Sequence, residues 1–159
     1  SHPDRYAMDL ISEALNDMGS RLFLKIREEL GLAYYVGTQN FTGRIPGCFT
    51  FYAGTSAESA AQVEKELTSQ AKRLAKEGLT AEELHRAKAK LTGHKKIARQ
   101  DLGSVAFVTC MDELLGLGFN HHAEEDARIE SVTLDQAREA AALYFGTDQF
   151  ATAISLPGK

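Results

Sequence analysis

The stretch from Gly19 to Gly37 constrains the fold most, because it predicts a helix that stops at a glycine and leads directly into a strand. The hydroxyl of Ser20 can accept a hydrogen bond from the free amides of a first helical turn. Gly31 stands where a helix often ends in a left-handed residue, and the aromatic and β-branched residues after it favour a strand. Four apolar side chains recur at helical spacing: Leu22, Phe23, Ile26 and Leu30.

A cation and a phenol lie close to this predicted junction. Arg27 falls one turn before the helix end, and Tyr34 falls seven positions later on the strand. Two long side chains so placed are expected to reach over the same edge of a sheet, where a guanidinium and a phenol can hold a peptide carbonyl or carboxylate. Spacing alone leaves a second interpretation open, in which Arg27 pairs with a carboxylate such as that of Glu28 and Tyr34 is half-buried core.

The rest of the chain predicts an α+β layout, with an antiparallel or mixed sheet and helices packed on one face. A helix with an apolar face of Tyr6, Leu10 and Ile11 precedes the Gly19 stretch. After the first strand we expect a loop over 42–47 and a second strand over 48–53, paired as an antiparallel hairpin. We then expect helices over 55–77 and 121–129 and a strand over 150–156. Three further helices are expected to begin at a capping box of Thr80 and Glu83, at an Asp101 cap, and at a capping box of Thr133 and Gln136.

Length and composition indicate one folded unit, and we expect residues 1–159 to form a single domain. Hydrophobic residues make up 43% of the chain and charged residues 25%, which is typical of a chain with a packed core. The net charge of −4 argues against a nucleic-acid partner. No apolar run approaches the roughly 20 residues of a membrane helix. The start lacks an initiator Met, so we expect a piece of a longer protein.

Three groups of residues have a plain structural interpretation. Cys48 and Cys110 are expected to be two separate buried thiols, without a disulfide framework. The basic residues of the helix after Thr80 are expected to form a solvated face, with binding of an acidic substrate as the alternative; they are Lys88, Lys90, Lys95, Lys96 and Arg99. The aromatic residues of the hairpin are expected to pack in the core, since the negative charge disfavours a base-stacking surface; they are Tyr34, Tyr35, Phe41, Phe49, Phe51 and Tyr52.

The nearest approach to a metal motif is His121-His-Ala-Glu-Glu125. In H-x-x-E-H, the two imidazoles bind zinc and the carboxylate acts on the zinc-bound water. His121 and Glu124 have this spacing, but Glu125 stands where the second histidine belongs. A polar surface helix is therefore favoured, and an autonomous zinc enzyme that uses His121, His122 and Glu125 is the weakest alternative. The chain also lacks a G-x-S-x-G nucleophile elbow and a glycine-rich phosphate loop.

Several separated stretches resemble one family. The run G-S-R-L-F-L-K-I-R-E-E-L-G-L-A-Y-Y-V is similar to the second-half domain of pitrilysin- and insulinase-like (M16) zinc peptidases and of mitochondrial processing peptidase subunits. The stretches F-T-F-Y-A-G-T-S, G-L-T-A-E-E-L-H-R-A-K-A-K-L and R-I-E-S-V-T-L-D-Q-A-R-E-A-A follow in the same order. The resemblance extends from about Asp4 to Leu156.

This resemblance implies a LuxS/metallohydrolase α+β sandwich with its first strand missing. Family peptidases form a chamber from paired halves, of which one carries H-x-x-E-H and the other supplies an Arg and a Tyr separated by seven residues. Arg27 and Tyr34 match that pair. The implied role is to anchor a substrate and to stabilise the carbonyl as negative charge develops. The lack of a zinc motif is also what the resemblance implies for a second half.

The resemblance therefore implies the substrate-binding, non-zinc half of an M16 peptidase, inactive in proteolysis alone. Its implied partners are a zinc-bearing half, on the same chain or another, and a peptide substrate; zinc is expected in the parent enzyme and not in this domain. An exposed sheet edge could also join two copies as a homodimer. The alternative from another class is a structural module derived from such a peptidase, in which Arg27 and Tyr34 no longer act. A bacterial cytoplasm or periplasm fits the family, although the sequence leaves the compartment open.

Overall fold

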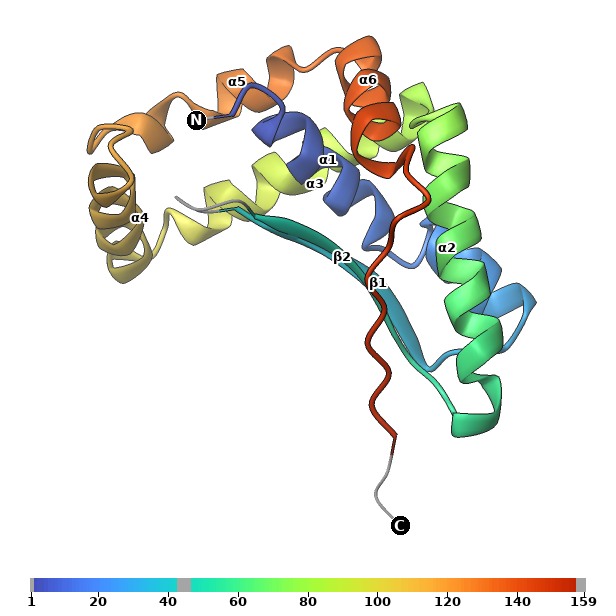
Figure 1. Cartoon of the computed structure of the whole chain (residues 1–159). Coiled ribbons are helices and arrows are strands. Elements are labelled where there is room, and N and C mark those ends of the chain that lie inside the picture. The colour runs from blue at the N-terminus through green and yellow to red at the C-terminus, as the bar shows by residue number, and fades with distance from the viewer. Residues whose placement is uncertain (1, 43–46, 157–159) are drawn as a thin grey trace.

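The computed structural model describes residues 2–42 and 47–156 and has the expected α+β architecture (Figure 1). Most of the loop predicted over 42–47 lies outside the described residues. In chain order the elements are α1 (Arg5–Leu15), η1 (Phe23–Glu29), β1 (Tyr35–Phe41), β2 (Cys48–Gly54), η2 (Ala57–Ser59), α2 (Ala60–Glu77), α3 (Ala81–Ala98), α4 (Leu102–Leu114), η3 (His121–Ala123), α5 (Glu125–Ser131) and α6 (Leu134–Phe145). η1 is a π-helix, whereas η2 and η3 are single 3₁₀ turns.

The predicted hairpin is confirmed. β1 and β2 pair antiparallel, from Tyr35 opposite Gly54 to Phe41 opposite Cys48. Phe49 and Phe51 point to the helices, and their ring centroids lie 4.9 Å and 5.6 Å from that of Phe145 on α6. These two aromatic side chains therefore belong to the core, as the sequence predicts.

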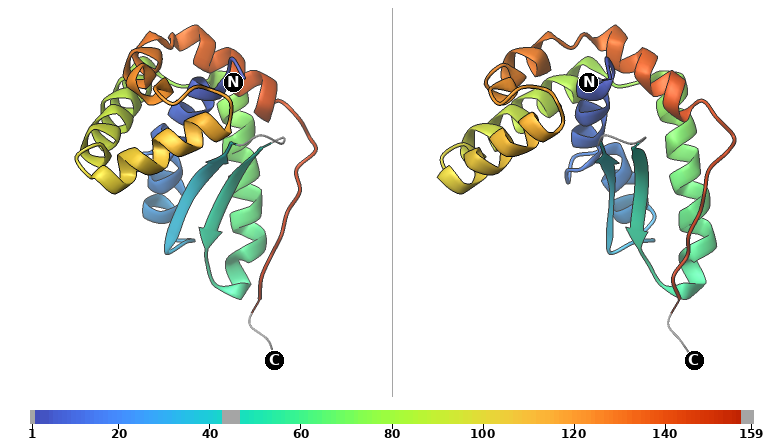
Figure 2. Two further views of the ribbon diagram at one scale, coloured as in Figure 1. Left: turned by 90° about the vertical axis from the view of Figure 1, so that its left-hand side faces the viewer. Right: turned by 60° about the vertical axis from the view of Figure 1, so that its left-hand side comes forward.

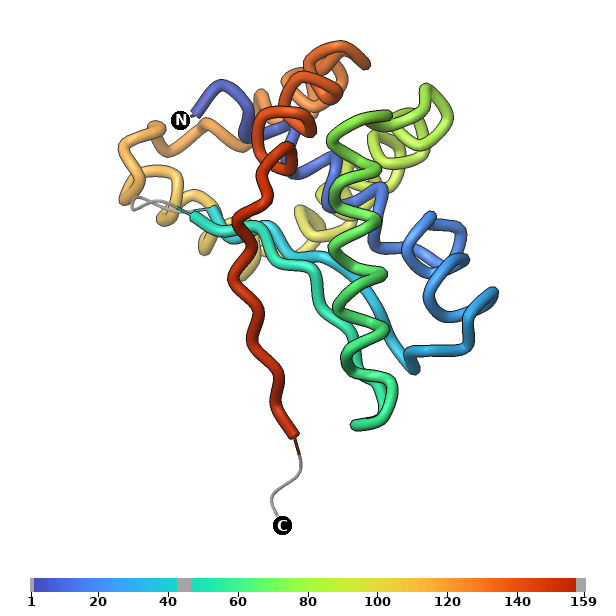
Figure 3. Tube along the Cα trace, turned by 45° about the vertical axis from the view of Figure 1, so that its right-hand side comes forward, coloured from blue at the N-terminus to red at the C-terminus, as the bar shows by residue number. Residues whose placement is uncertain are grey.

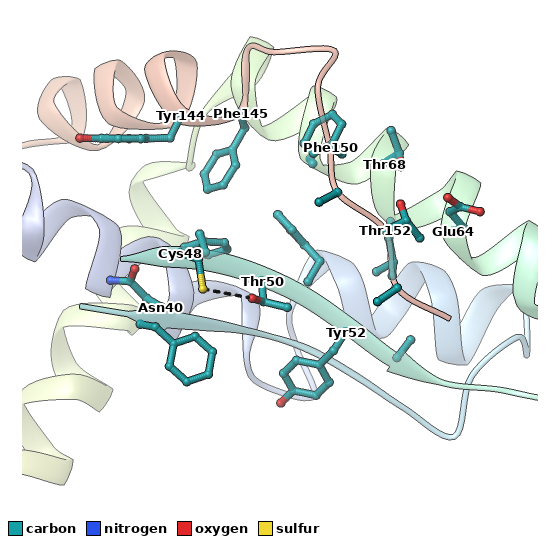
Figure 4. A pocket seen from close by; sticks show the side chains of 18 of the residues that line it. Asn40, Cys48, Thr50, Tyr52, Glu64, Thr68, Tyr144, Phe145, Phe150 and Thr152 are labelled. Carbon is teal, nitrogen blue, oxygen red and sulfur yellow. Dashed lines mark hydrogen bonds between the residues drawn. The ribbon is translucent and has the colours of Figure 1, made fainter. Parts of the chain in front are cut away.

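The same prediction is wrong for the other aromatic residues of the hairpin. Side chains alternate between the two faces of a strand, so the residues that alternate with Phe49 and Phe51 along β2 point away from the helices. Figure 4 shows Tyr52 on the side of the hairpin away from Phe145. This uncovered side is called the open face below. The exposed aromatic residues are Tyr34, Tyr35, Phe41 and Tyr52.

Helix α1 lies at the centre of the core, where it contacts α3, α5, α6 and β1. Its apolar face is the predicted one: Leu10 and Ile11 are fully buried, and Leu15 is nearly so. Figure 3 shows α1 passing behind α2 and α6, with the hairpin below it. The helices are capped as predicted, by complete capping boxes at Thr80 and Thr133 and by Asp101, whose carboxylate accepts from the Ser104 amide at 2.7 Å.

The strand predicted over 150–156 is wrong in one respect. The segment is extended, but it has no strand partner among residues 2–42 and 47–156. A strand requires a hydrogen-bonded neighbour, and Figure 2 shows the segment running beside the hairpin without joining β2. Its apolar side chains stay outside, with Ile154 and Leu156 exposed. The alternation of residues therefore predicts the extended backbone correctly and the pairing incorrectly.

The single polar surface helix predicted over 121–129 is also wrong. The chain instead forms the turn η3 and then α5, and His121, Glu125 and Ile129 are all buried. The prediction fails because polar side chains can be buried when each meets a polar partner. The expectation of buried thiols is wrong as well, because Cys48 and Cys110 are both free and exposed.

Candidate functional site

The site begins at the capped start of η1. Ser20 is buried, and its hydroxyl accepts a hydrogen bond from the Phe23 amide at 3.2 Å, as the sequence predicts. Leu22 and Ile26 are fully buried beneath the helix. The wider π-helical turn is the part that residue spacing did not predict. The Leu30 amide reaches the Lys25 carbonyl five residues back, and such turns are frequent at functional sites.

A glycine turn then carries the chain from η1 to the sheet. Gly31 has a φ of +61°, a left-handed conformation that a side chain disfavours. The Gly31 amide donates to the Arg27 carbonyl, and the Leu32 amide donates to the Ile26 carbonyl. The Tyr34 amide then donates to the Gly54 carbonyl of β2 at 2.8 Å. The backbone on both sides of the turn is therefore fixed, and Arg27 and Tyr34 project from it.

The structure brings Arg27 and Tyr34 together at the surface. The guanidinium carbon of Arg27 lies 5.7 Å from the Tyr34 ring centroid, and 4.7 Å from that of Phe23 one helical turn earlier. Tyr34 is 80% exposed, which rules out a half-buried core role, and the Arg27 side chain is 41% exposed. Its contact with Glu28 is long, 3.8 Å from Nε to Oε1. The N–H groups of Arg27 are therefore accessible to a ligand.

The sequence predicted Phe23 on the apolar stripe of the helix but not the contact of its ring with the Arg27 guanidinium. A cation over an aromatic face is stabilised by the ring quadrupole, typically by about 0.5–1 kcal/mol at an exposed site. Phe23 and Tyr34 together restrict the guanidinium while leaving its N–H edge free, because rings contact it through their faces. The spacing of four residues between Phe23 and Arg27 is the signal that could have revealed this contact.

The histidine cluster does not form the metal site considered above. The Tyr6 hydroxyl lies 3.0 Å from Nε2 of His121, and Nδ1 of His122 lies 3.2 Å from Asp112 Oδ2. Glu125 instead contacts three cations, those of Arg5, Lys95 and Arg99, with Lys95 Nζ the nearest at 2.8 Å from its carboxylate. These side chains point to different partners. Among the described residues no cluster of three or more His, Cys, Asp or Glu side chains suits a metal ion.

The basic residues of α3 and of its C-cap, Arg99, are more than a solvated face. Lys90 contacts Glu13 of α1 at 3.0 Å, Lys95 contacts Glu125, and Arg99 contacts Asp126 at 2.8 Å. The hydrogen bond from Arg99 lowers the pKa of Asp126 below its ordinary value. These pairs join α3 to α1 and α5, so the expected free basic surface is largely used within the fold.

A groove of about 1470 Å³ follows the outer side of β2. Its walls are β2, α2 and the extended segment after α6, with His2 and Arg5 at one end. Figure 4 shows Phe145 and Phe150 above the strand, Thr68 and Glu64 of α2 beside it, and Thr50 and Tyr52 on its other side. The lining is mainly apolar or uncharged, and it adjoins the hairpin, whose first strand begins at Tyr35; Tyr34 therefore lies one residue before the strand on which the sequence placed it.

Comparison with known proteins places the chain in a family. The family model described as "Peptidase M16 inactive domain" matches residues 1–91, more than half of the chain. The chain belongs to the peptidase M16 family. The family is thus the one that the separated motifs of the sequence indicate.

Relatives and solved structures agree with this assignment. An uncharacterized zinc protease of Streptomyces coelicolor is 33% identical over 138 residues, and one of Bacillus subtilis is 28% identical over 158 residues. These alignments take in 86% and 98% of this chain, but the chain spans only 30% and 38% of those proteins. Zinc thus appears in the names of these longer relatives, and the part of this chain that the structure describes shows no cluster suited to a metal ion.

Two solved structures share the fold. The peptidase M16 inactive domain from Pseudomonas fluorescens has a TM-score of 0.76 at 24% identity, covering 90% of this chain and 34% of that one. A protease from Helicobacter pylori has a TM-score of 0.80 at 21% identity, covering 91% and 35%. The α+β fold is thus shared with a solved M16 inactive domain, and this chain spans about a third of each of these two chains. Within the described residues, no helix is both long and apolar enough to cross a bilayer.

Proposed function

We propose that this chain is the substrate-binding, non-zinc half of an M16 peptidase and that Arg27 and Tyr34 bind the substrate beside a zinc site on a partner half. The observation that carries the proposal is the accessible pair at the helix-to-strand junction, 5.7 Å from guanidinium carbon to ring centroid. It occurs in a domain of a family whose model is described as inactive and whose longer relatives are named zinc proteases. The domain therefore contributes binding groups.

The chemistry of the pair suits a peptide carbonyl. The guanidinium donates hydrogen bonds to a substrate carbonyl or carboxylate oxygen, and it keeps its charge at any physiological pH. The Tyr34 hydroxyl donates a second hydrogen bond to the same oxygen or its neighbour. As negative charge develops on the scissile carbonyl, both bonds strengthen, and only such a gain raises the rate of the chemical step.

His121, His122 and Glu125 do not fit a zinc ion, because each is bound to a separate partner, and no other suitable cluster lies within residues 2–42 and 47–156. Activation of water is accordingly assigned to the zinc-bearing half. The role left to this chain is to orient the peptide and to stabilise charge through Arg27 and Tyr34.

The proposal is tested in the longer protein, or in this chain assembled with its zinc-bearing half. Arg27→Ala should lower kcat/KM for peptide hydrolysis by about 10²–10³, the cost of removing one oxyanion donor. Tyr34→Phe should lower it by about tenfold or more, because one hydrogen bond to a charged group is worth about 1.5–3 kcal/mol.

The matched control is Arg86→Ala on α3. The Arg86 side chain is also 41% exposed, and it pairs only with Glu82 of its own helix in the described structure. Its removal should leave turnover unchanged. Undiminished turnover in both Arg27→Ala and Tyr34→Phe would favour the alternative, a structural module in which the pair no longer acts.

A further inference from the structure

The open face of the hairpin carries two tyrosine rings that lie over glycines. Tyr35 is the cross-strand partner of Gly54, and Tyr52 is the partner of Gly37. A Cβ at Gly54 would lie 2.3 Å from the Tyr35 ring, and one at Gly37 would lie 2.6 Å from Asn16 Oδ1 and 2.8 Å from the Tyr52 hydroxyl. The Tyr35 ring thus occupies the space that a side chain at position 54 would need, and Asn16 and Tyr52 together occupy that at position 37. The glycines allow both rings to lie along the sheet.

These rings continue the series of ring contacts that begins at the candidate site, with Tyr34 edge-on to Tyr35 and Tyr35 tilted to Tyr52. The ring centroids of Tyr34 and Tyr35 are 6.5 Å apart, and those of Tyr35 and Tyr52 are 6.2 Å apart. With Phe23 and Arg27 at one end, the series leads from the proposed catalytic groups onto the open face. We call Tyr34, Tyr35 and Tyr52 the tyrosine ladder. All three rings are exposed, with Tyr35 at 54% and Tyr52 at 42%.

The spacing of the ladder fits an extended peptide. A strand rises about 3.3 Å per residue, and alternate side chains share one face, so side chains two positions apart repeat at about 6.6 Å. The two ring separations are close to this repeat. A peptide held by its carbonyl at Arg27 and Tyr34 can therefore set alternate side chains on successive rings.

The surroundings indicate which side chains those are. Neither β1 nor β2 contains a charged residue, so the open face offers no carboxylate to a basic side chain. Exposed phenol faces gain most from other aromatic rings, through offset or edge-to-face contacts worth about 0.5–1.5 kcal/mol each. We propose that the tyrosine ladder is a substrate subsite that selects aromatic side chains at alternate positions of an extended peptide.

This inference rests on the proposed function for the position of the peptide, but it is tested by binding alone. The probes are two blocked, isomeric peptides, Ala-Phe-Ala-Phe-Ala and Ala-Phe-Phe-Ala-Ala, titrated into the 159-residue chain while tyrosine ring resonances are followed by NMR. The alternating peptide should bind about three- to tenfold more tightly and should shift the rings of Tyr35 and Tyr52.

Variants make the assignment specific. Tyr35→Ser and Tyr52→Ser should each remove the preference for the alternating peptide, whereas Tyr35→Phe should keep it, because the ring remains. Phe41→Ser is the matched control, since Phe41 is an exposed aromatic residue at the far end of the same strand and lies outside the ladder. It should leave the preference intact.

Equal binding of the two isomers, or a preference that survives in both serine variants, overturns the inference. Tighter binding of Ala-Lys-Ala-Lys-Ala overturns the aromatic assignment. These results do not depend on turnover, so they are distinct from a failure of the proposed function. That failure would be seen as undiminished hydrolysis in Arg27→Ala and Tyr34→Phe.

Discussion

At the scale of single residues, Glu83 shows how one carboxylate can hold two elements together. Its Oε2 accepts from the Thr80 amide at 2.8 Å to complete the capping box of α3, and the Arg21 guanidinium binds both of its oxygens. Burial works to raise the pKa of Glu83, but the hydrogen bonds from Arg21 and from the Thr80 backbone outweigh it and lower the pKa below the ordinary 4.5.

Glu83→Gln should destabilise the chain by about 1.5–3 kcal/mol at pH 7, because the amide cannot accept both bonds from Arg21. A carboxylate whose pKa is lower in the folded than in the unfolded state adds its full contribution to the free energy of unfolding when the pH is above the unfolded-state pKa. This contribution disappears as the pH falls through the folded-state pKa. Urea unfolding should therefore show a large gap between wild type and variant at pH 7 and a smaller gap at strongly acidic pH. Glu82→Gln, at an exposed pair, is the control, and a gap independent of pH would contradict the prediction.

Residue types also decide which parts of the site were predictable. Ser20 and Gly31 act through their own backbone neighbours, so their roles as cap and turn follow from the sequence. The side chains of Arg27 and Tyr34 meet because a turn of fixed geometry lies between them. The flat tyrosine rings over Gly37 and Gly54 depend on the cross-strand register, which residue order alone does not contain.

At the scale of elements, α4 is the helix least joined to the rest of the fold. It packs mainly on η3, and its Leu102, Phe107 and Leu114 are exposed. Its one buried residue is Asp112, whose carboxylate accepts from the His122 amide at 2.9 Å and contacts the His122 ring. These two contacts with His122 therefore position the C-terminal end of this helix.

Asp112→Ala should release α4 locally with little change in global stability, because the core does not depend on it. Two hydrogen bonds to a charged group are lost, each worth about 1.5–3 kcal/mol, so amides of 102–114 should exchange at least about tenfold faster. Hydrogen exchange with mass spectrometry measures this directly. Glu113→Ala, at the exposed neighbouring position, should leave the exchange unchanged; equal protection in both variants would show that α4 is held elsewhere.

Elements with strong local signals were predicted well. The capping boxes at Thr80 and Thr133 locate the starts of α3 and α6, and the apolar period of α1 gives its buried face. The failures lie where a distant partner decides the outcome. Burial of His121 depends on Tyr6, 115 positions earlier, and burial of Glu125 depends on Arg5 and Lys95. No local sequence pattern predicts these contacts.

At the scale of the whole molecule, the dominant feature is the outer edge of β2. Seven residues of this strand have a hydrogen-bonded neighbour only on the β1 side within the described structure, and the groove beyond them is largely uncharged. The extended segment 150–156 lines the far side of this groove, and Figure 2 shows its backbone running beside the hairpin. An alternating sequence predicts that this segment is extended, but only the assembled fold shows that it stays apart from β2.

An unpaired and uncharged edge favours pairing with another strand, so we propose that the 159-residue chain self-associates through β2. Sedimentation velocity should show a weight-average mass that rises with concentration. Thr50→Lys should suppress this rise, because a lysine on an edge strand would place a charge against the second copy. The control is Gln39→Lys, at the cross-strand partner of Thr50 on the same open face but on β1, away from the groove. A mass that stays at one chain throughout, or suppression by both variants alike, would show that β2 does not mediate the contact.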